Sequence, residues 1–578
     1  MSLLTRLGLR DLVARPRREQ ATFYFLLAVS LFLFMDQNLM SPNLAAIGED
    51  LIISRADVEK QLVATDPSFR GLLDGVAGDE ARGREIAHKL VQIRKELLAR
   101  TPALAKDAAK LDEAIAREAG QRLGEGDVAL VTKVAEAVRE REERVTVAFQ
   151  KRVDDEIAGR ASLWFWLLGG GVAIGVGYVT DKTSRKGLLF GTIVVGALPC
   201  LLTGFAQTAS QFVALRALTG IGIGAVLPLT YSLIGDLFTA RERPSAAAWI
   251  GLADGIGIAG GQLLAGMMGP VQGWRLPFIL VAIPNLVIAV LFLFMADEPK
   301  RGSGEEALHA AVEAGAEYTE RIHLSDLKKL FSNKTNLLLF FQGIPGSMPW
   351  GFFFTFLVDF YHSNKGYSVQ DATLLVTVFG GGAILGGFVG GLLGGWLYKK
   401  KPAYLPALCG TSILLGIAPI LVIVNWADAP GSPTQRAMEV LAGAAAAGSN
   451  ILIPALLGIV GAFIATMTSS NVKAVLIDVN PPENRGTIFS LFNMADDLGK
   501  GLAPFLIGSV LAVHFGRVTS YNISILMWLI CGVVWIALVK VFPKDVLALE
   551  RQMAERAKQI SAPAAQEPPR PAVAAGAR

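Results

Sequence analysis

Apolar segments of about 20 residues recur along this chain of 578 residues. Each is long enough to cross the roughly 30 Å hydrocarbon core of a bilayer as a helix. The first lies within residues 20–45, and the others cover approximately residues 161–180, 187–207, 211–236, 245–269, 275–296, 336–361, 371–397, 403–425, 446–477, 486–513 and 519–541. Only 18% of the chain is charged, whereas a soluble protein carries more charge. We therefore expect an all-α integral membrane protein with twelve transmembrane helices.

A polar linker at residues 297–334 divides the expected helices into two groups of six. The N-terminal transmembrane bundle then covers residues 20–45 and 161–296, and the C-terminal bundle covers residues 335–542. The halves share a repeat, because an acid precedes an arginine by seven residues both at Asp236–Arg243 and at Asp478–Arg485. Two pseudo-symmetric bundles of this kind are typical of transporters that rock around a substrate site between them.

Three charged segments lie outside the bundles. Residues 1–19 form a basic N-terminus, and residues 543–578 form a Pro- and Ala-rich tail whose composition is typical of disorder. Residues 46–160 form an insert between the first two membrane helices. Apolar residues follow helical spacing there, as at Ile86, Leu90 and Ile93, which predicts two or three amphipathic helices outside the bilayer. Whether this insert is a solvated structural element or binds a partner stays open.

Lysine and arginine in the short loops predict the orientation, because cytoplasmic loops carry an excess of both. One side has the basic N-terminus, Lys182, Arg185, Lys186, Arg241, Arg243, Lys300, Arg301, Lys399–Lys401 and Arg485, whereas the other has isolated Arg275, Lys365, Arg436 and Arg517. We therefore expect both termini in the cytoplasm and the insert outside. The surrounding partner is membrane lipid, and the membrane is expected to be a bacterial inner membrane.

Other classes of function find little support in the sequence. Cys200, Cys409 and Cys531 all lie in apolar segments, so no disulfide framework is expected. The five histidines are scattered, and no pattern resembles a metal-ligand cluster, a phosphate-binding loop or a nucleophile with its base. The sequence therefore predicts no enzyme, no cofactor, no metal and no nucleic-acid partner.

The stretch from Gly177 to Lys186 reads Gly-Tyr-Val-Thr-Asp-Lys-Thr-Ser-Arg-Lys. The order Gly-x-x-x-Asp-Lys-x-x-Arg-Lys resembles the signature loop between the second and third helices of the major facilitator superfamily. The runs from Arg216 to Gly222 and from Gly273 to Phe278 resemble two further motifs of that family. The resemblance implies two six-helix bundles and transport by alternating access.

A narrower resemblance is to the Spinster-like branch, whose members are associated with export of lysolipids and sphingolipids. It rests on Asp36 with Ser41–Leu44, on the Arg216 motif and on Glu298–Gly302. The branch usually follows its first-helix acid with arginine, where this chain has Gln37, and tends to carry a fourth-helix glutamate, where this chain has Ile223. If those groups couple protons in the branch, coupling here must run differently.

Ionisable side chains inside a bilayer are costly unless they are paired or hydrated, so each is a candidate functional residue. The candidates for binding the substrate or a coupling ion are Asp36, Asn38, Arg216, Asp254, Gln342, Lys473, Asp496, Asp497 and Lys500. Two alternatives stay open for the first pair. Asp36 is a proton carrier or a helix-to-helix hydrogen-bond partner, and Arg216 binds an anionic group or forms a fixed salt bridge, with Asp36 as its candidate partner.

Spacing adds detail at two of these places. Asp496 and Lys500 are four residues apart, so they share one helix face as an internal pair. Asp497 is turned about 100° away from Asp496 and is predicted to be the free group. Gln342 lies in Phe341–Gly346, where the glycines and Pro345 predict a break in the seventh helix.

A second group of residues is expected at the cytoplasmic helix ends and to act as a gate: Gly177, Asp181, Arg185, Lys186, Asp236, Arg243, Asp478 and Arg485. Asp181 is predicted to meet Arg485 or the positive end of the eleventh helix, and Arg185 is predicted to reach Asp236. Both contacts would hold the cytoplasmic side closed, so losing them would shift the populations of two states rather than abolish binding.

The favoured function is a secondary active transporter of a small organic anion, or of an amphiphile with an anionic head group such as a lysolipid. Proton or sodium coupling is left open. The alternative is a receptor or scaffold with a transporter fold, whose insert binds a partner. Deleting about residues 55–155 separates the two, because surviving transport would make the insert accessory.

Overall fold

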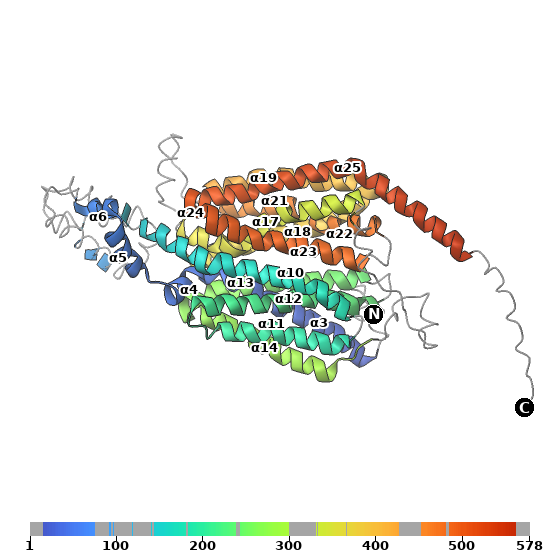
Figure 1. Cartoon of the computed structure of the whole chain (residues 1–578), viewed down its shortest axis with the longest axis horizontal. Coiled ribbons are helices and arrows are strands. Elements are labelled where there is room, and N and C mark those ends of the chain that lie inside the picture. Colours follow the sequence, from blue (N-terminus) through green and yellow to red (C-terminus); the bar gives the residue numbers. More distant parts are fainter. Residues whose placement is uncertain are drawn as a thin grey trace, which may run out of the picture.

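The structure is a computed structural model of the whole chain. It describes residues 16–74, 144–180, 183–238, 243–299, 333–365, 367–426, 452–480 and 485–561, together with Phe331 and isolated positions between 89 and 141. The regular elements in these ranges are helices, and most of them run side by side in one elongated bundle (Figure 1). An all-helical fold is therefore confirmed.

The bundle has two halves. The N-terminal half contains α3 (Arg17–Gln37), η1 (Ser41–Asn43), α4 (Leu44–Leu51), α10 (Arg160–Thr180), α11 (Arg185–Thr203), α12 (Ala209–Leu237), α13 (Arg243–Gln272) and α14 (Arg275–Met295). The C-terminal half contains α17 (Lys334–Ser363), α18 (Val369–Lys400), α19 (Tyr404–Trp426), α21 (Leu452–Thr466), α22 (Ser469–Asp478), α23 (Arg485–Ala503), η7 (Pro504–Leu511), α24 (Ala512–Phe515) and α25 (Arg517–Ser561). Packing of α10 against α23 and of α13 against α18 forms the seam between the halves.

Eleven helices in the described ranges are long and apolar enough to cross a membrane, one fewer than expected. The helix outside this count is α23, which nevertheless packs against α10 and α17 within the bundle. Asp496, Asp497 and Lys500 lie within little more than one turn of α23, and three charges so close together lower its apolar character. The structure thus confirms a polytopic helical membrane protein, in which eleven of the described helices are long and apolar enough to cross a bilayer.

Part of the insert is described. Helices α5 (Arg55–Thr65) and α6 (Pro67–Asp74) extend beyond one end of the bundle, opposite the end at which α25 protrudes (Figure 1). We call these the insert end and the linker end. Arg141, in a later part of the insert, pairs with Glu59 on α5, with 2.8 Å between Nε of Arg141 and Oε1 of Glu59. The returning helix runs from residue 144 through the π-helix η4 (Asp154–Gly159) into α10, so no break separates the insert from the second membrane helix.

Two glycines set the separation between α10 and α12. A Cβ on Gly220 would lie 2.1 Å from the carbonyl oxygen of Phe165, and one on Gly224 would lie 2.0 Å from that of Gly169. Neither space can hold a methyl group, so the two backbones approach closely only because these residues lack side chains. Gly171, also on α10, faces open space.

Candidate functional site

Asp36 and Arg216 form a buried ion pair inside the N-terminal half. Arg216 donates from Nη1 to Oδ1 of Asp36 over 2.6 Å and from Nη2 to the Asp36 carbonyl oxygen over 3.2 Å. Each side chain is only 3% exposed. The thiol of Cys200 donates to the same carboxylate oxygen. The structure therefore shows the predicted pairing of Arg216 on α12 with Asp36 on α3.

A small cavity lies beside this pair and between the two halves. Its lining comes from Gln37, Asn38, Met40, Ser41, Ala161, Ser162, Phe165, Trp166 and Arg216 of the N-terminal half and from Phe354 and Thr355 of the C-terminal half. The guanidinium carbon of Arg216 lies 5.0 Å from the centre of the Phe165 ring. The lining is thus mainly polar and aromatic, with Arg216 as its one cation.

The polar lining is only partly satisfied within the protein. Asn38 donates to Oε1 of Gln262 on α13 over 3.3 Å, which holds it in place. By contrast, Oε1 of Gln37 is buried and has no hydrogen-bond partner. Buried polar atoms normally find partners, so this cavity has hydrogen-bonding capacity for water or a ligand.

The three charges on α23 form one cluster. Nζ of Lys500 lies 2.5 Å from Oδ2 of Asp496 and 3.5 Å from Oδ1 of Asp497. The predicted Asp496–Lys500 pair is therefore confirmed. The prediction that Asp497 is free is wrong, because the flexible lysine side chain reaches both carboxylates. The Lys500 ammonium also lies 4.7 Å from the ring centre of Trp166, which lines the cavity from the other half. This cluster therefore lies at the seam.

Asp254 on α13 and Lys473 on α22 attract each other across the two halves. One oxygen of Asp254 is buried without a hydrogen-bond partner, and Lys473 is exposed. They do not line the small cavity described above. The structure thus separates these two candidates from Asp36, Asn38 and Arg216.

Gln342 lies in a continuous helix. The predicted break is wrong, because α17 runs unbroken from Lys334 to Ser363 and accommodates both Pro345 and Pro349. Pro345 removes one backbone donor, but neighbouring helices and backbone adjustments satisfy such sites in membrane helices. The Gln342 amide oxygen accepts from the thiol of Cys531 on α25 over 3.0 Å. Gln342 therefore contributes a contact within the C-terminal half.

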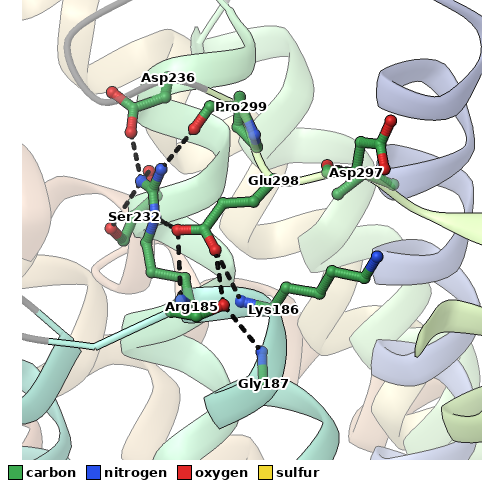
Figure 2. A network of polar contacts seen from close by, with 10 residues as sticks. Arg185, Lys186, Gly187, Ser232, Asp236, Asp297, Glu298 and Pro299 are labelled. Atoms are coloured by element: carbon green, nitrogen blue, oxygen red, sulfur yellow. Dashed lines mark hydrogen bonds and ion pairs between the residues drawn. The ribbon is translucent and has the colours of Figure 1, made fainter. Parts of the chain in front are cut away.

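At the linker end, Arg185 lies at the centre of a polar network (Figure 2). The predicted pairing with Asp236 is confirmed. Nε of Arg185 also donates to Glu298 over 2.9 Å, and Nη2 donates to the Pro299 carbonyl oxygen over 2.7 Å. Glu298 was missed as a site residue, although its place in the Glu298–Gly302 motif was a signal for it. It fixes the end of α14 to the start of α11.

Burial alone would raise the pKa of Glu298, but its hydrogen bonds outweigh that effect. The Arg185 guanidinium, the Ser184 hydroxyl and the backbone N–H groups of Lys186 and Arg185 all donate to its carboxylate, so the net pKa is lowered. A carboxylate with several donors favours its charged form. Glu298 is therefore ionised at neutral pH.

This network does not join the two halves. Arg185, Asp236 and Glu298 all belong to the N-terminal half and to the segment directly after it, so the expectation that Arg185–Asp236 latches the halves together is wrong. Two neighbouring helices of one bundle move together when the halves rock. The Lys186 side chain points away from the network and only its backbone N–H contributes (Figure 2).

The remaining predicted gate residues are described in part. Gly177 lies in α10, and Asp478 hydrogen-bonds Tyr398 within the C-terminal half. Arg243 and Arg485 begin α13 and α23, and their side chains lie outside the described part. Asp181 lies outside the described residues, as does the predicted Asp181–Arg485 contact.

Direct hydrogen bonds between the halves, in the ranges that the structure describes, lie toward the insert end. The hydroxyl oxygens of Ser162 on α10 and Thr355 on α17 are 3.0 Å apart, and both residues line the cavity. Near the linker end, the described polar contacts stay within one half, as in the pair Asn336–Asn480. The two halves are therefore in contact between the cavity and the insert end, which closes the bundle on that side.

Two groups of membrane-length helices, closed at one end over a polar cavity in their seam, define a polytopic carrier of the transporter class. The sequence profile of the Major Facilitator Superfamily matches residues 152–504. The chain belongs to the Major Facilitator Superfamily.

Named relatives are transporters. The chain is 24% identical to the hexuronate transporter of Bacillus subtilis over 349 residues, which cover 57% of this chain and 74% of that protein. It is 25% identical to the cis,cis-muconate transport protein of Acinetobacter baylyi over 269 residues, which cover 45% of this chain and 62% of that protein.

Solved structures share the fold. A bacterial homologue of the human lysosomal transporter Spinster, in an inward-facing and unoccupied conformation, superposes with a TM-score of 0.58 at 13% identity and covers 92% of this chain and 98% of that one. A D-xylose-proton symporter superposes with a TM-score of 0.54 at 15% identity and covers 89% of this chain and 97% of that one.

Proposed function

We propose that this protein is a secondary active transporter that carries a small organic anion by alternating access. The observation that carries the proposal is the position of Arg216, a buried cation that lines a polar cavity between the halves. Guanidinium groups bind carboxylates with two parallel hydrogen bonds, and Asp36 accepts from two of the five N–H groups of Arg216, through its carboxylate and its carbonyl oxygen. The substrates named for the two relatives, a hexuronate and cis,cis-muconate, are carboxylates.

We also propose that the Asp36–Arg216 pair couples transport to protons. With Asp36 ionised, the pair is neutral and attracts an anion weakly. Protonation of Asp36 would leave the positive charge of Arg216 for the substrate, so one proton and one negative charge would bind together. The groups in contact with the Asp36 carboxylate are Arg216 and Cys200, and only Arg216 carries charge. A proton gradient is therefore preferred to a sodium gradient as the driving force.

The polarity of the cavity wall favours an anion over a lysolipid. An acyl chain needs a long apolar channel, and this cavity has polar groups on much of its wall. The receptor alternative has no specific observation in its favour, and a role of the insert in binding a partner stays a proposal.

We further infer that α23, η7 and α24 form the twelfth span and that the linker end faces the cytoplasm of a bacterial inner membrane. The start of α3 and the end of α25 lie at the linker end. The basic residues Arg185 and Lys186 at the start of α11 lie at the same end, which favours the cytoplasmic side. Closure at the insert end then corresponds to an inward-facing state.

Uptake into proteoliposomes tests the function. The pH gradient is imposed with either the lumen or the outside of the vesicles more acidic. We expect transport of cis,cis-muconate or a hexuronate and little transport of xylose. Arg216→Gln should lose transport. Equal transport by Arg216→Gln, or transport of xylose alone, would refute an anion carrier built on Arg216. Transport of lysophosphatidylcholine alone would favour the amphiphile instead.

A further inference from the structure

The charged groups that hold the insert end closed include residues outside the predicted site. Arg517, at the start of α25, donates to both oxygens of Asp154, from Nε over 3.0 Å and from Nη2 over 2.5 Å. The same guanidinium pairs with Asp359 on α17. Exposed fractions are 5% for Arg517, 3% for Asp154 and 5% for Asp359. These three residues form a buried cluster, which we call the Arg517 cluster.

The Arg517 cluster joins the two halves. Asp154 lies in η4 of the helix that enters α10, whereas Asp359 and Arg517 belong to the C-terminal half. Asn364 reinforces the contact, because it accepts from Arg517 over 3.3 Å and its amide nitrogen lies 3.5 Å from the Gln150 amide oxygen on the other half. The Arg517 cluster thus differs from the Arg185 network, whose members move together.

The position of the Arg517 cluster places it over the cavity. Ser162 lies eight residues after Asp154 on one continuous helix, and Thr355 lies four residues before Asp359 on α17. Ser162 and Thr355 meet across the halves and line the cavity. Along both helices, the order is therefore the Arg517 cluster, then the Ser162–Thr355 contact, then the cavity.

Its chemistry suits a contact that opens to water. A buried ion pair contributes little net stability compared with apolar packing, so it is a poor device for permanent closure. If the halves separate at the insert end, water solvates the guanidinium and both carboxylates. A π-helical turn such as η4, which packs against η7 of the other half, is also frequent at functional sites.

We propose that Asp154, Asp359 and Arg517 are the gate that closes the transport path at the insert end, with Asp154 and Arg517 making the contact that opens. This inference rests on the transport function proposed above. Asp359, which lies in the same half as Arg517, holds the guanidinium in position and need not separate from it.

Disulfide formation in Ser162→Cys/Thr355→Cys measures closure without any substrate. The two hydroxyl oxygens are 3.0 Å apart, which brings the sulfurs of the closed state near bonding distance. The three native cysteines are buried and give a low background. The rate is measured under mild oxidant on purified protein in lipid nanodiscs, and thermal unfolding of each variant is measured first.

In this background, we expect Asp154→Asn and Arg517→Gln to slow cross-linking at least tenfold. Asp359→Asn should slow it less than Asp154→Asn does, since it loosens the position of Arg517 but keeps the contact between the halves. The matched control is Asp155→Asn, the next residue on the same helix, which is 51% exposed and paired with Arg160 at the surface. It should cross-link like the parent.

Cross-linking at the parent rate in folded Asp154→Asn and Arg517→Gln would overturn the proposal. If neither variant folds, Arg517→Lys decides it, because lysine keeps the charge but loses the two-point contact with Asp154. A slower rate then supports the gate, and an unchanged rate overturns it. Because no substrate is used, failure here leaves the transport assay unaffected, and failure of transport leaves this readout intact.

Discussion

Arg216 and Asp36 pair within one half of the protein, from α12 to α3, with 2.6 Å between Nη1 and Oδ1. Because both helices belong to the same half, rocking of the halves does not separate them. Only protonation or a bound ligand changes their interaction. This distinguishes them from Asp154 and Arg517, which pair across the halves and therefore respond to the motion itself.

Asp36→Asn should preserve transport at acid pH but remove its pH dependence, because an amide resembles the protonated acid and leaves Arg216 positive. The measurement is the pH profile of anion uptake into proteoliposomes. A variant whose profile matches that of the parent would exclude Asp36 as the proton-binding group.

Arg216→Gln should lower the free energy of unfolding by about 3–5 kcal/mol, since removing one partner leaves the other charge buried and unpaired. The double variant Asp36→Asn/Arg216→Gln should recover most of that loss, because neither residue is then charged, yet it should not transport. Chemical unfolding in detergent measures the stability. Equal stability of the two variants would contradict the assigned pairing.

Glu298→Gln should destabilise the folded protein at neutral pH by about 1 kcal/mol, a modest value because the carboxylate is partly exposed. The pKa of Glu298 is lowered from its ordinary value of 4.5 by its donors. Its contribution is therefore fully present above pH 4.5 and is lost as the pH falls through the lower folded-state pKa. Thermal unfolding at pH 7 and in acid checks this. Asp297→Asn, which removes an exposed partner of Arg18, should have almost no effect at either pH.

Gly224→Ala should destabilise the protein by about 1–3 kcal/mol, the usual cost of forcing an extra methyl group into a packed interior. The added Cβ would meet the Gly169 carbonyl oxygen at 2.0 Å. Gly171→Ala is the control, because its Cβ meets nothing within 4 Å. Unfolding of both variants gives the comparison, and equal stability would argue against close approach of α10 and α12.

Oxidised Ser162→Cys/Thr355→Cys should lose at least nine-tenths of its transport, because a bond across the halves prevents opening at the insert end. A reductant should restore it, and each single cysteine variant should transport with or without oxidant. Undiminished transport with complete cross-linking would show that this contact need not open.

The sequence predicted the parts of this protein that have a strong local signal. Segment length and hydropathy were sufficient for the helical membrane fold, and the acid-to-arginine spacing drew attention to Asp236. The Arg185–Asp236 pair formed as expected because the signature loop and the end of the fourth helix are adjacent in the bundle. The Asp496–Lys500 pair followed from helix geometry alone.

Other features depend on packing between distant helices, which spacing does not encode. Arg517 was interpreted as an isolated loop charge, because its partners Asp154 and Asp359 lie 363 and 158 residues away. Asp154 is one of many charged residues in the insert, and its spacing does not distinguish it from the others. The angle on the helix alone predicts that Asp497 is free, because it does not include the reach of the Lys500 side chain.

The unbroken helix from residue 144 to Thr180 has a practical consequence. This helix is also bound directly to α5, because Arg152 donates to the Gln61 amide oxygen over 3.0 Å, and it continues into α10 without interruption. We expect an antibody fragment that grips α5 to act on the transporting half as a rigid handle. A panel of such fragments could then trap single conformations for imaging.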